Sequence, residues 1–177
     1  RDVSTLISKS LDLKEVLDSI TTNLARSLIT KGCAIYLLST IEKRLKLKSS
    51  YGLSDAYLNK GPIDAEKSIA GCLDGKPVFV LDATTDPKIQ YGAETEKEGV
   101  ASILSVPISA KGQIIGVLRI YTAKSHEFTE NETEFIFGIT EMGGIAIENA
   151  NMYDQLKGKH EKLITDTHQW FEFGRTA

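Results

Sequence analysis

The stretch Ser102–Tyr121, SILSVPISAKGQIIGVLRIY, decides the fold of this 177-residue chain. Two apolar runs rich in β-branched residues flank the polar break Ala110–Gln113, and the Lys-Gly pair at its centre is typical of a β-hairpin turn. The second run, Gln113–Tyr121, has one ionic residue in its interior, Arg119. A strand that is apolar on both faces lies in the middle of a covered sheet. We therefore expect Gln113–Tyr121 to be the central strand of a single antiparallel sheet.

The overall composition indicates a folded domain without nucleic-acid or membrane partners. Apolar residues make up 41% of the chain, which is enough to fill a core. The net charge is −3 with acids and bases interspersed, unlike the basic surface of a nucleic-acid-binding protein. No apolar run is long enough to cross a bilayer, and we expect no signal peptide, because no basic segment followed by an apolar one occurs near Arg1. We therefore expect a cytoplasmic protein, or a fragment of one.

Hydrophobic periodicity places the other elements around this hairpin. A helical repeat follows Asp12, whose side chain is suited to cap a helix. Apolar and polar residues, lysines among them, alternate over Leu45–Tyr51, a pattern typical of an edge strand. The expected elements are the helix Leu13–Leu28, the hairpin strands Cys33–Ser39 and Leu45–Tyr51, a short helix Ser68–Leu73, a short strand Val78–Leu81 and a long helix after Thr129.

The apolar residues of these elements predict a core between the two long helices and one face of the sheet. Side chains alternate between the faces of a strand, so Leu118 and Ile120 share the helix side while Arg119 points to the other side. The expected core members are Leu17, Ile20, Leu24, Ile35, Leu37, Leu104, Val106, Leu118, Ile120, Ile136 and Ile139.

The polar stretch Asp82–Gly99 interrupts the sheet and is far longer than a hairpin requires. Long connections of this kind in compact domains are often functional loops. The alternative is a solvent-exposed loop without a functional role.

The long C-terminal helix opens with a capping box, because Glu132 follows Thr129 by three residues. Its apolar or small positions recur at steps of three and four, close to the coiled-coil repeat. Beyond Asn151 this stripe has no partner in its own chain, so we expect it to join a second copy of the protein. The apolar end Trp170–Phe173 is expected to dock as well. The expected dimer interface consists of Ile139, Met142, Ala146, Ala150, Tyr153 and Leu156.

In this order of elements, three stretches make the chain resemble a GAF domain. They are SIAGCLDGKPVFVLDATTDP at Ser68–Pro87, SILSVPISAKGQIIGVLRIYT at Ser102–Thr122 and FTENETEFIFGITEMGGIAIENANMYDQL at Phe128–Leu156. The resemblance covers about residues 11–156, leaving 1–10 as an incoming helix or linker and 157–177 as a helical extension. It implies an α+β fold in which terminal helices cover one face of a central antiparallel sheet of five or six strands, and short helices and loops cover the other. It also implies a regulatory domain, usually dimeric, that binds a small molecule and signals to an output domain.

The specialised branches of the family match poorly. The cyclic-nucleotide motif N-K-x-F-D-E is absent, because the nearest text, Asn59-Lys60, continues differently. Bilin-binding members use a pocket cysteine, which Asp82–Gly99 lacks, and the histidines lie too late in the chain for an axial haem ligand. One branch reduces free methionine sulfoxide with several pocket cysteines, whereas this chain has only Cys33 and Cys72, both expected to be buried. We therefore expect no catalytic activity and no metal site, and no cofactor is identified.

The resemblance implies a pocket between the sheet and a cover made by Ser68–Leu73 and Asp82–Gly99. Arg119 points to this side, and its planar guanidinium is suited to anchor an anionic ligand. Alternatively, Arg119 pairs with Asp82 or Asp86, or reaches solvent. A pocket filled by its own side chains would leave a ligand-free dimerisation or interaction module. The candidate ligand-binding residues are Phe79, Leu81, Asp82, Thr84, Tyr91, Val100, Ser102, Arg119 and Tyr121.

Overall fold

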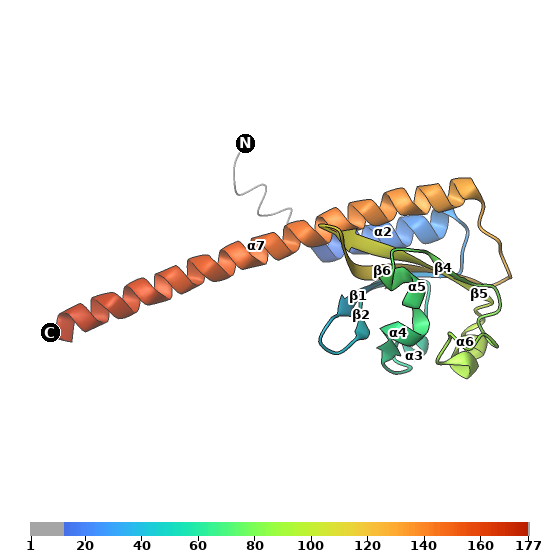
Figure 1. Ribbon diagram of the computed structural model, residues 1–177, viewed down its shortest axis with the longest axis horizontal. Coiled ribbons are helices and arrows are strands. Elements are labelled where there is room, and N and C mark those ends of the chain that lie inside the picture. The colour runs from blue at the N-terminus through green and yellow to red at the C-terminus, as the bar shows by residue number, and fades with distance from the viewer. Residues whose placement is uncertain (1–12, 177) are drawn as a thin grey trace. The chain divides into compact units, whose positions relative to one another are not determined.

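A six-stranded antiparallel sheet forms the centre of the fold (Figure 1). The computed structural model describes residues 13–176, with side chains as far as Leu156. It divides into two compact units, Lys14–Ile145 and the part of the last helix from Ala146 onward. The strands, in the spatial order β3-β2-β1-β6-β5-β4, are β1 Gly32–Ser39, β2 Arg44–Tyr51, β3 Ile63–Asp64, β4 Val78–Val80, β5 Ser102–Ala110 and β6 Gln113–Thr122.

The central position of the second hairpin strand is confirmed, because β6 pairs with β5 on one side and with β1 on the other. The turn residues Lys111 and Gly112 have φ values of 51° and 74°. Positive φ at both central residues is the requirement of a type I′ hairpin turn, whose twist matches that of the strands.

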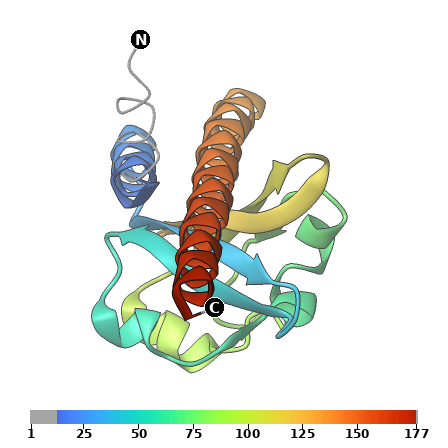
Figure 2. The same ribbon diagram turned by 90° about the vertical axis from the view of Figure 1, so that its left-hand side faces the viewer.

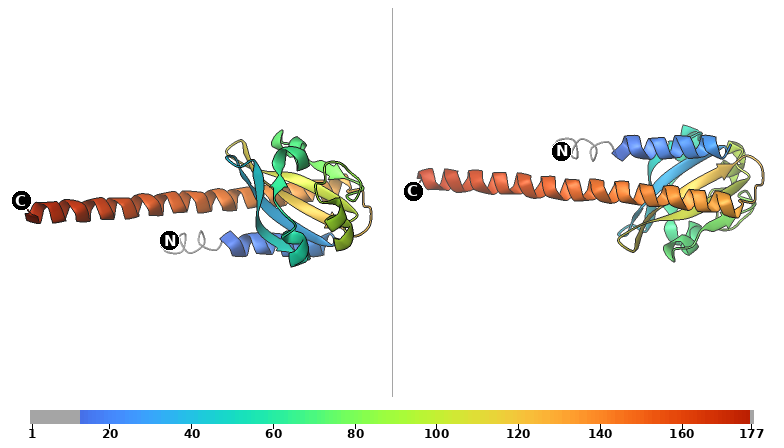
Figure 3. Two further views of the ribbon diagram at one scale, coloured as in Figure 1. Left: turned by 90° about the horizontal axis from the view of Figure 1, so that it is seen from below. Right: turned by 90° about the horizontal axis from the view of Figure 1, so that it is seen from above.

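The predicted helix side of the sheet is confirmed within the unit Lys14–Ile145. Here α2, Leu13–Ser27, and the first turns of α7, Glu130–Thr176, lie side by side over one face of the strands (Figures 2 and 3). Gly144 permits this approach, since a Cβ at that position would overlap the Ser109 carbonyl oxygen. Of the expected core, Leu17, Leu24, Ile35, Leu104, Val106, Leu118, Ile120 and Ile136 are buried, whereas Ile20, Leu37 and Ile139 are half-buried.

Short helices cover the opposite face: α3 Asp55–Leu58, α4 Ala65–Ser68, α5 Ala70–Leu73 and α6 Gly92–Glu98. The single helix expected over Ser68–Leu73 is wrong. The Asp64 side chain accepts a hydrogen bond from the Lys67 backbone N–H and begins α4 earlier, so Ser68 ends that helix. Ile69, which is fully buried, separates α4 from α5 with a non-helical φ of −137°.

The edge position expected for Leu45–Tyr51 holds for most of β2. Only its first two residues pair with the short strand β3, which the sequence analysis did not predict. Two residues are too few to display a strand period, and their pairing depends on where the chain returns rather than on local sequence.

The predicted capping box at the start of α7 is confirmed. The Glu132 carboxylate accepts a hydrogen bond from the Thr129 backbone N–H, and the Thr129 hydroxyl accepts one from the Glu132 backbone N–H, both at 3.1 Å. None of the helices in the described part of the chain is long and apolar enough to span a membrane. The expected cap at Asp12 and the side chains of Trp170–Phe173 fall outside the described residues.

Candidate functional site

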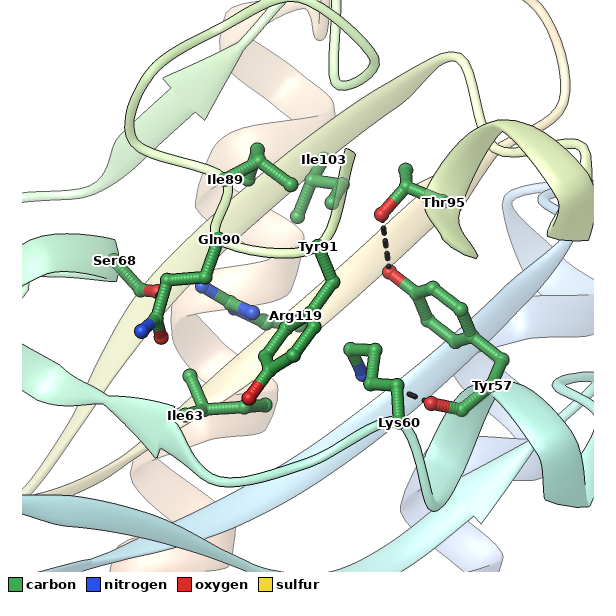
Figure 4. A pocket seen from close by; sticks show the side chains of 10 residues that line it. All are labelled: Tyr57, Lys60, Ile63, Ser68, Ile89, Gln90, Tyr91, Thr95, Ile103 and Arg119. Atoms are coloured by element: carbon green, nitrogen blue, oxygen red, sulfur yellow. Dashed lines mark hydrogen bonds between the residues drawn. The ribbon is translucent and has the colours of Figure 1, made fainter. Parts of the chain in front are cut away.

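A small cavity lies between the sheet and the cover, on the side opposite α2 (Figure 4). Its volume of about 10 Å³ is roughly the space that a single water occupies. Its lining comes from two segments of the cover, residues 57–68 and residues 89–95, and from the strands β5 and β6. The lining residues are Tyr57, Lys60, Ile63, Ser68, Ile89, Gln90, Tyr91, Thr95, Ile103 and Arg119.

Arg119 forms the floor of this cavity. It shares the cover face of β6 with Val117 and Tyr121, and it is only 4% exposed. Its Nε donates a hydrogen bond of 3.0 Å to the hydroxyl of Ser105, the residue directly opposite on β5. No carboxylate of the described residues lies within ion-pair distance of the guanidinium. Arg119 is therefore a buried cation with one neutral partner, an arrangement that costs free energy of folding.

The alternatives considered for Arg119 do not match the structure. Asp82 is exposed and accepts hydrogen bonds from the backbone N–H and the hydroxyl of Thr84. Asp86 pairs with Lys88 at 3.6 Å. Both carboxylates thus have partners of their own at the start of the long loop, and the guanidinium is buried rather than extended to solvent.

Lys60 is a second cation at the same cavity. Its Nζ lies 3.9 Å from the centre of the Tyr57 ring and donates a hydrogen bond to the Tyr57 carbonyl oxygen. Burial, and secondly the charge of Arg119, lower the pKa of Lys60 to about 8. The site therefore concentrates positive charge without a matching acid in its lining.

Three tyrosines occupy the core on the cover side of the sheet. The Tyr57 hydroxyl pairs with the Thr95 hydroxyl at 3.2 Å, and the rings of Tyr57 and Tyr121 meet edge to face at 5.9 Å. The hydroxyls of Tyr36 and Tyr121 are buried, and neither has a hydrogen-bond partner among the described residues. Burial raises the pKa of Tyr57 and of Tyr121, so these phenols remain neutral hydrogen-bond donors.

Hydrogen bonds between the two cover segments close the cavity. The Tyr91 hydroxyl donates to the Pro62 carbonyl oxygen at 2.6 Å, and the Gln90 side chain accepts from the Asp64 backbone N–H at 2.7 Å. Gly61 has a φ of 144°, and a Cβ there would overlap the Tyr91 hydroxyl. A ligand larger than a water can enter only if these two segments separate.

A carboxylate strengthens the same closure at the far end of the cover. Glu98 accepts hydrogen bonds from both the backbone N–H and the hydroxyl of Ser54, the N-cap of α3. It also lies 4.0 Å from the Lys31 ammonium. Residues 54–64 and 90–98 are therefore joined at several points along their length.

The structure brings together only part of the predicted pocket. Tyr91 and Arg119 line the cavity, and Tyr121 is buried in the adjoining core. The other predicted residues lie outside the lining. The Phe79 ring meets the Phe128 ring edge to face, Leu81 and Asp82 are exposed, and the Thr84 hydroxyl donates a hydrogen bond to Asp82. Val100 is buried in the core on the cover side, and the Ser102 hydroxyl donates to the Leu81 carbonyl oxygen.

Sequence reasoning missed the first cover segment, which supplies Tyr57, Lys60 and Ile63. The available signal was the pair Gly61-Pro62, a backbone break directly after a lysine. The irregular pattern of Gly52–Lys67 has no helical or strand period, so local sequence did not place this segment over the sheet.

The two cysteines are poor candidates for thiol chemistry. Both are buried, as expected. Burial raises the pKa of Cys72 to about 11 and that of Cys33 above the usual range, so both remain protonated near neutral pH. The Cys72 thiol donates a weak hydrogen bond to the Ser105 carbonyl oxygen. Within the described residues, no group of three acidic, histidine or cysteine side chains is placed to hold a metal ion.

The expected dimer residues are distributed over two faces of α7. Met142 and Leu156 are exposed, Ile139, Ala146 and Tyr153 are half-buried, and Ala150 is buried. Among the side chains of α7 that the structure describes, the large apolar ones that are exposed are Phe135, Met142, Ile145, Met152 and Leu156.

Comparisons with known proteins agree with this architecture. A family model described as GAF domain matches residues 10–148. Over 140 residues, 75% of its length, the chain is 30% identical to a methyl sulfide methyltransferase-associated sensor of Methanosarcina acetivorans. Over 124 residues, 67% of its length, it is 31% identical to a Nif-specific regulatory protein of Azospirillum lipoferum. The chain spans 14% of the first relative and 20% of the second.

A solved structure extends the likeness to the fold. The GAF domain of a phosphoenolpyruvate-protein phosphotransferase from Coxiella burnetii superimposes with a TM-score of 0.71 at 19% identity. The match covers 85% of this chain and 95% of that one. At this level of identity, the likeness concerns the fold.

Proposed function

The chain belongs to the GAF domain family, and from that premise we propose that it is a regulatory sensor domain without catalytic activity of its own. A small-molecule ligand binds in the cavity between the sheet and the cover, and α7 carries the signal to an output domain. The sensor and the regulatory protein among its relatives are several times longer than this chain, which supports a modular arrangement of this kind.

The observation that carries the proposal is the polar lining of the cavity. Seven of the ten lining residues present a hydroxyl, amide or cationic group: Tyr57, Lys60, Ser68, Gln90, Tyr91, Thr95 and Arg119. Four of them, Tyr57, Ser68, Thr95 and Arg119, are buried, where polar groups are uncommon because each one costs desolvation free energy. Convergent polar groups under a cover are typical of ligand sites.

Thermal unfolding of the purified protein with a panel of metabolites tests this function. A ligand that binds only the folded state stabilises it by about 2.7 kcal/mol at 100 times its dissociation constant. We expect at least one chemical class in the panel to raise the melting temperature. If no compound does, even at millimolar concentration, the sensor proposal fails.

A ligand-free interaction module is the second candidate, and the volume of the cavity favours it. About 10 Å³ admits no metabolite unless the cover opens. Under this alternative, the hydrogen bonds that join the two cover segments are purely structural. A methionine sulfoxide reductase is less well supported, since neither Cys33 nor Cys72 is an accessible thiolate.

We further propose that two copies associate through the exposed stripe of α7, defined by Phe135, Met142, Ile145, Met152 and Leu156. One series along α7 repeats every seven residues and consists of Phe135, Met142, Asn149 and Leu156. A second series lies three residues after it and contains Ile145 and Met152. This is the a and d pattern of a two-stranded coiled coil, and an asparagine at one a position fixes register and oligomer state. A second copy of the same helix is the partner with the matching repeat.

Light scattering of the variant Met142→Glu tests this association. A carboxylate inside the seam would be desolvated without a partner, so the protein should become monomeric at tens of micromolar while its fold is kept. The variant Asn151→Glu is the matched control, because Asn151 is exposed on α7 but lies outside the stripe. A dimer that persists in Met142→Glu, or a monomeric wild type, would contradict the proposed interface.

A further inference from the structure

The geometry of the cavity points to the chemical class of its occupant. Building on the proposed sensor function, we propose that the ligand is a small oxyanion, a carboxylate or a phosphate, whose oxygens are bound between the Arg119 guanidinium and the Lys60 ammonium. The relatives' names do not specify this chemistry, and it follows from the charges of the lining residues alone.

Arg119 has hydrogen-bond donors that no described residue uses. A guanidinium presents five N–H donors in a rigid fork that matches the oxygens of a carboxylate or phosphate. Only Nε has a hydrogen-bond partner among the described residues, the Ser105 hydroxyl. A guanidinium that is 4% exposed and lacks a counter-ion is costly, and a bound anion would remove that cost.

Lys60 places a second cation in the same lining (Figure 4). Its neighbours are the rings of Tyr57 and Tyr91, the guanidinium of Arg119, and two carboxylates of α6, Glu94 and Glu98. Glu98 is held by Ser54 and lies near Lys31, and neither acid lines the cavity. The lining therefore contains two cations and no carboxylate, an arrangement complementary to an anion.

The remaining polar groups of the lining are neutral hydrogen-bonding side chains. The Tyr57 and Thr95 hydroxyls bond each other, so only one of their two protons is used and the other can donate toward an anion oxygen. The amide nitrogen of Gln90 adds N–H donors, whereas the Tyr91 proton is already used at the Pro62 carbonyl. Burial keeps the Tyr57 phenol neutral by raising its pKa, so that group does not compete with the ligand's charge.

One consequence distinguishes this occupant from a neutral one. Burial and Arg119 lower the pKa of Lys60 to about 8, so part of the lysine population is neutral at mildly alkaline pH. An anion placed beside the ammonium raises that pKa again. Binding near pH 8 must therefore be accompanied by proton uptake.

The test is thermal unfolding of the full chain with sodium acetate, sodium succinate and sodium phosphate, with sodium chloride used to equalise ionic strength. At 100 times its dissociation constant, the bound salt should raise the melting temperature by about 5 °C or more over chloride. The variant Arg119→Gln should lose this shift in melting temperature. The variant Lys60→Gln should keep a smaller shift that corresponds to an apparent affinity at least tenfold lower. The variant Lys97→Gln, which removes an exposed lysine of α6, should retain it. The salts themselves separate carboxylate from phosphate ligands.

Two further readouts keep the outcome decisive. If Arg119→Gln fails to fold, Arg119→Lys tests the planar fork with its charge retained, and its response should also be lost. Calorimetry near pH 8 in buffers of different ionisation enthalpy should show proton uptake for the wild type and none for Lys60→Gln. Equal binding enthalpies in all buffers for the wild type would overturn the proposed role of Lys60.

The panel also separates failure of this inference from failure of the sensor function. It includes the neutral compounds nicotinamide and adenosine and the cation choline at the same concentrations. If only a neutral or cationic compound raises the melting temperature, the oxyanion class is wrong and the sensor function stands. If no compound of any charge does, both proposals fail.

Discussion

The two faces of the sheet differ although they share the same strands. On β6, Leu118 and Ile120 point to the helices and are buried among apolar side chains, while Arg119 and Tyr121 alternate with them and point to the cover. The helix face is mainly apolar, and its buried polar pair, Thr21 of α2 and Ser49 of β2, is satisfied by a mutual hydrogen bond and by the Asp18 carboxylate. The cover face holds a guanidinium with one neutral partner and two buried phenols without partners. The difference indicates that the helix face stabilises the domain, whereas the cover face gives up stability to keep a polar site.

The closest packing on the helix face should be the most sensitive to change. In Gly144→Ala, the new Cβ would overlap the Ser109 carbonyl oxygen, so α7 must shift away from β5. We expect a loss of about 1–3 kcal/mol in the free energy of unfolding, measured by urea denaturation.

Gly138→Ala is the matched control on the same helix. Its Cβ would meet nothing within 4 Å, so alanine should stabilise α7 by up to about 1 kcal/mol through its better helix propensity. If both substitutions change the free energy of unfolding in the same direction, the close approach of α7 to β5 is not a source of stability.

On the cover face, the effect of removing a hydroxyl should depend on whether that hydroxyl has a hydrogen-bond partner. In Tyr121→Phe, a buried hydroxyl without a partner is removed, so the free protein should gain about 1 kcal/mol of stability. In Tyr57→Phe, a hydroxyl paired with Thr95 is removed, and we expect a loss of about 1 kcal/mol. Urea denaturation of the two variants measures this difference, and a destabilised Tyr121→Phe would show that its hydroxyl is well accommodated.

The stability of the cover face should also depend on pH through Lys60. Its pKa in the folded state is about 8, below its ordinary value of 10.5, so the unfolded chain binds the additional proton between these values. Stability contributed by this group therefore rises as the pH increases from about 8 toward about 10.5. The stability of the wild type relative to Lys60→Met should therefore rise over that range. Its stability relative to Lys97→Met, at an exposed site, should stay constant.

The helix face was predictable from sequence because its signals are local. The hairpin turn, the alternation on β6 and the Thr129 capping box each depend on residues close together in the chain. The same alternation explains why the prediction that Phe79 lines the pocket was wrong. Phe79 pairs with Leu104, which faces the helices, so both side chains lie on that side of the sheet.

The cover was only partly predictable because its arrangement depends on contacts between distant segments. The Tyr91 hydroxyl reaches the Pro62 carbonyl, and the Gln90 side chain bonds the backbone of Asp64. No periodic pattern encodes these pairings, so the contribution of residues 57–63 to the cavity was missed. The position of Arg119 was predicted, since it follows from strand alternation alone.

Hydrogen exchange measured by mass spectrometry tests most directly whether the cover face is a site that opens. A ligand larger than a water can enter the cavity of about 10 Å³ only if residues 54–64 move apart from residues 90–98. We predict that amides of these segments exchange through local opening, faster than those of β6, and that the compound which raises the melting temperature slows them selectively. Cover amides protected as strongly as β6 in the free protein, or unaffected by that compound, would contradict the proposed function of this face.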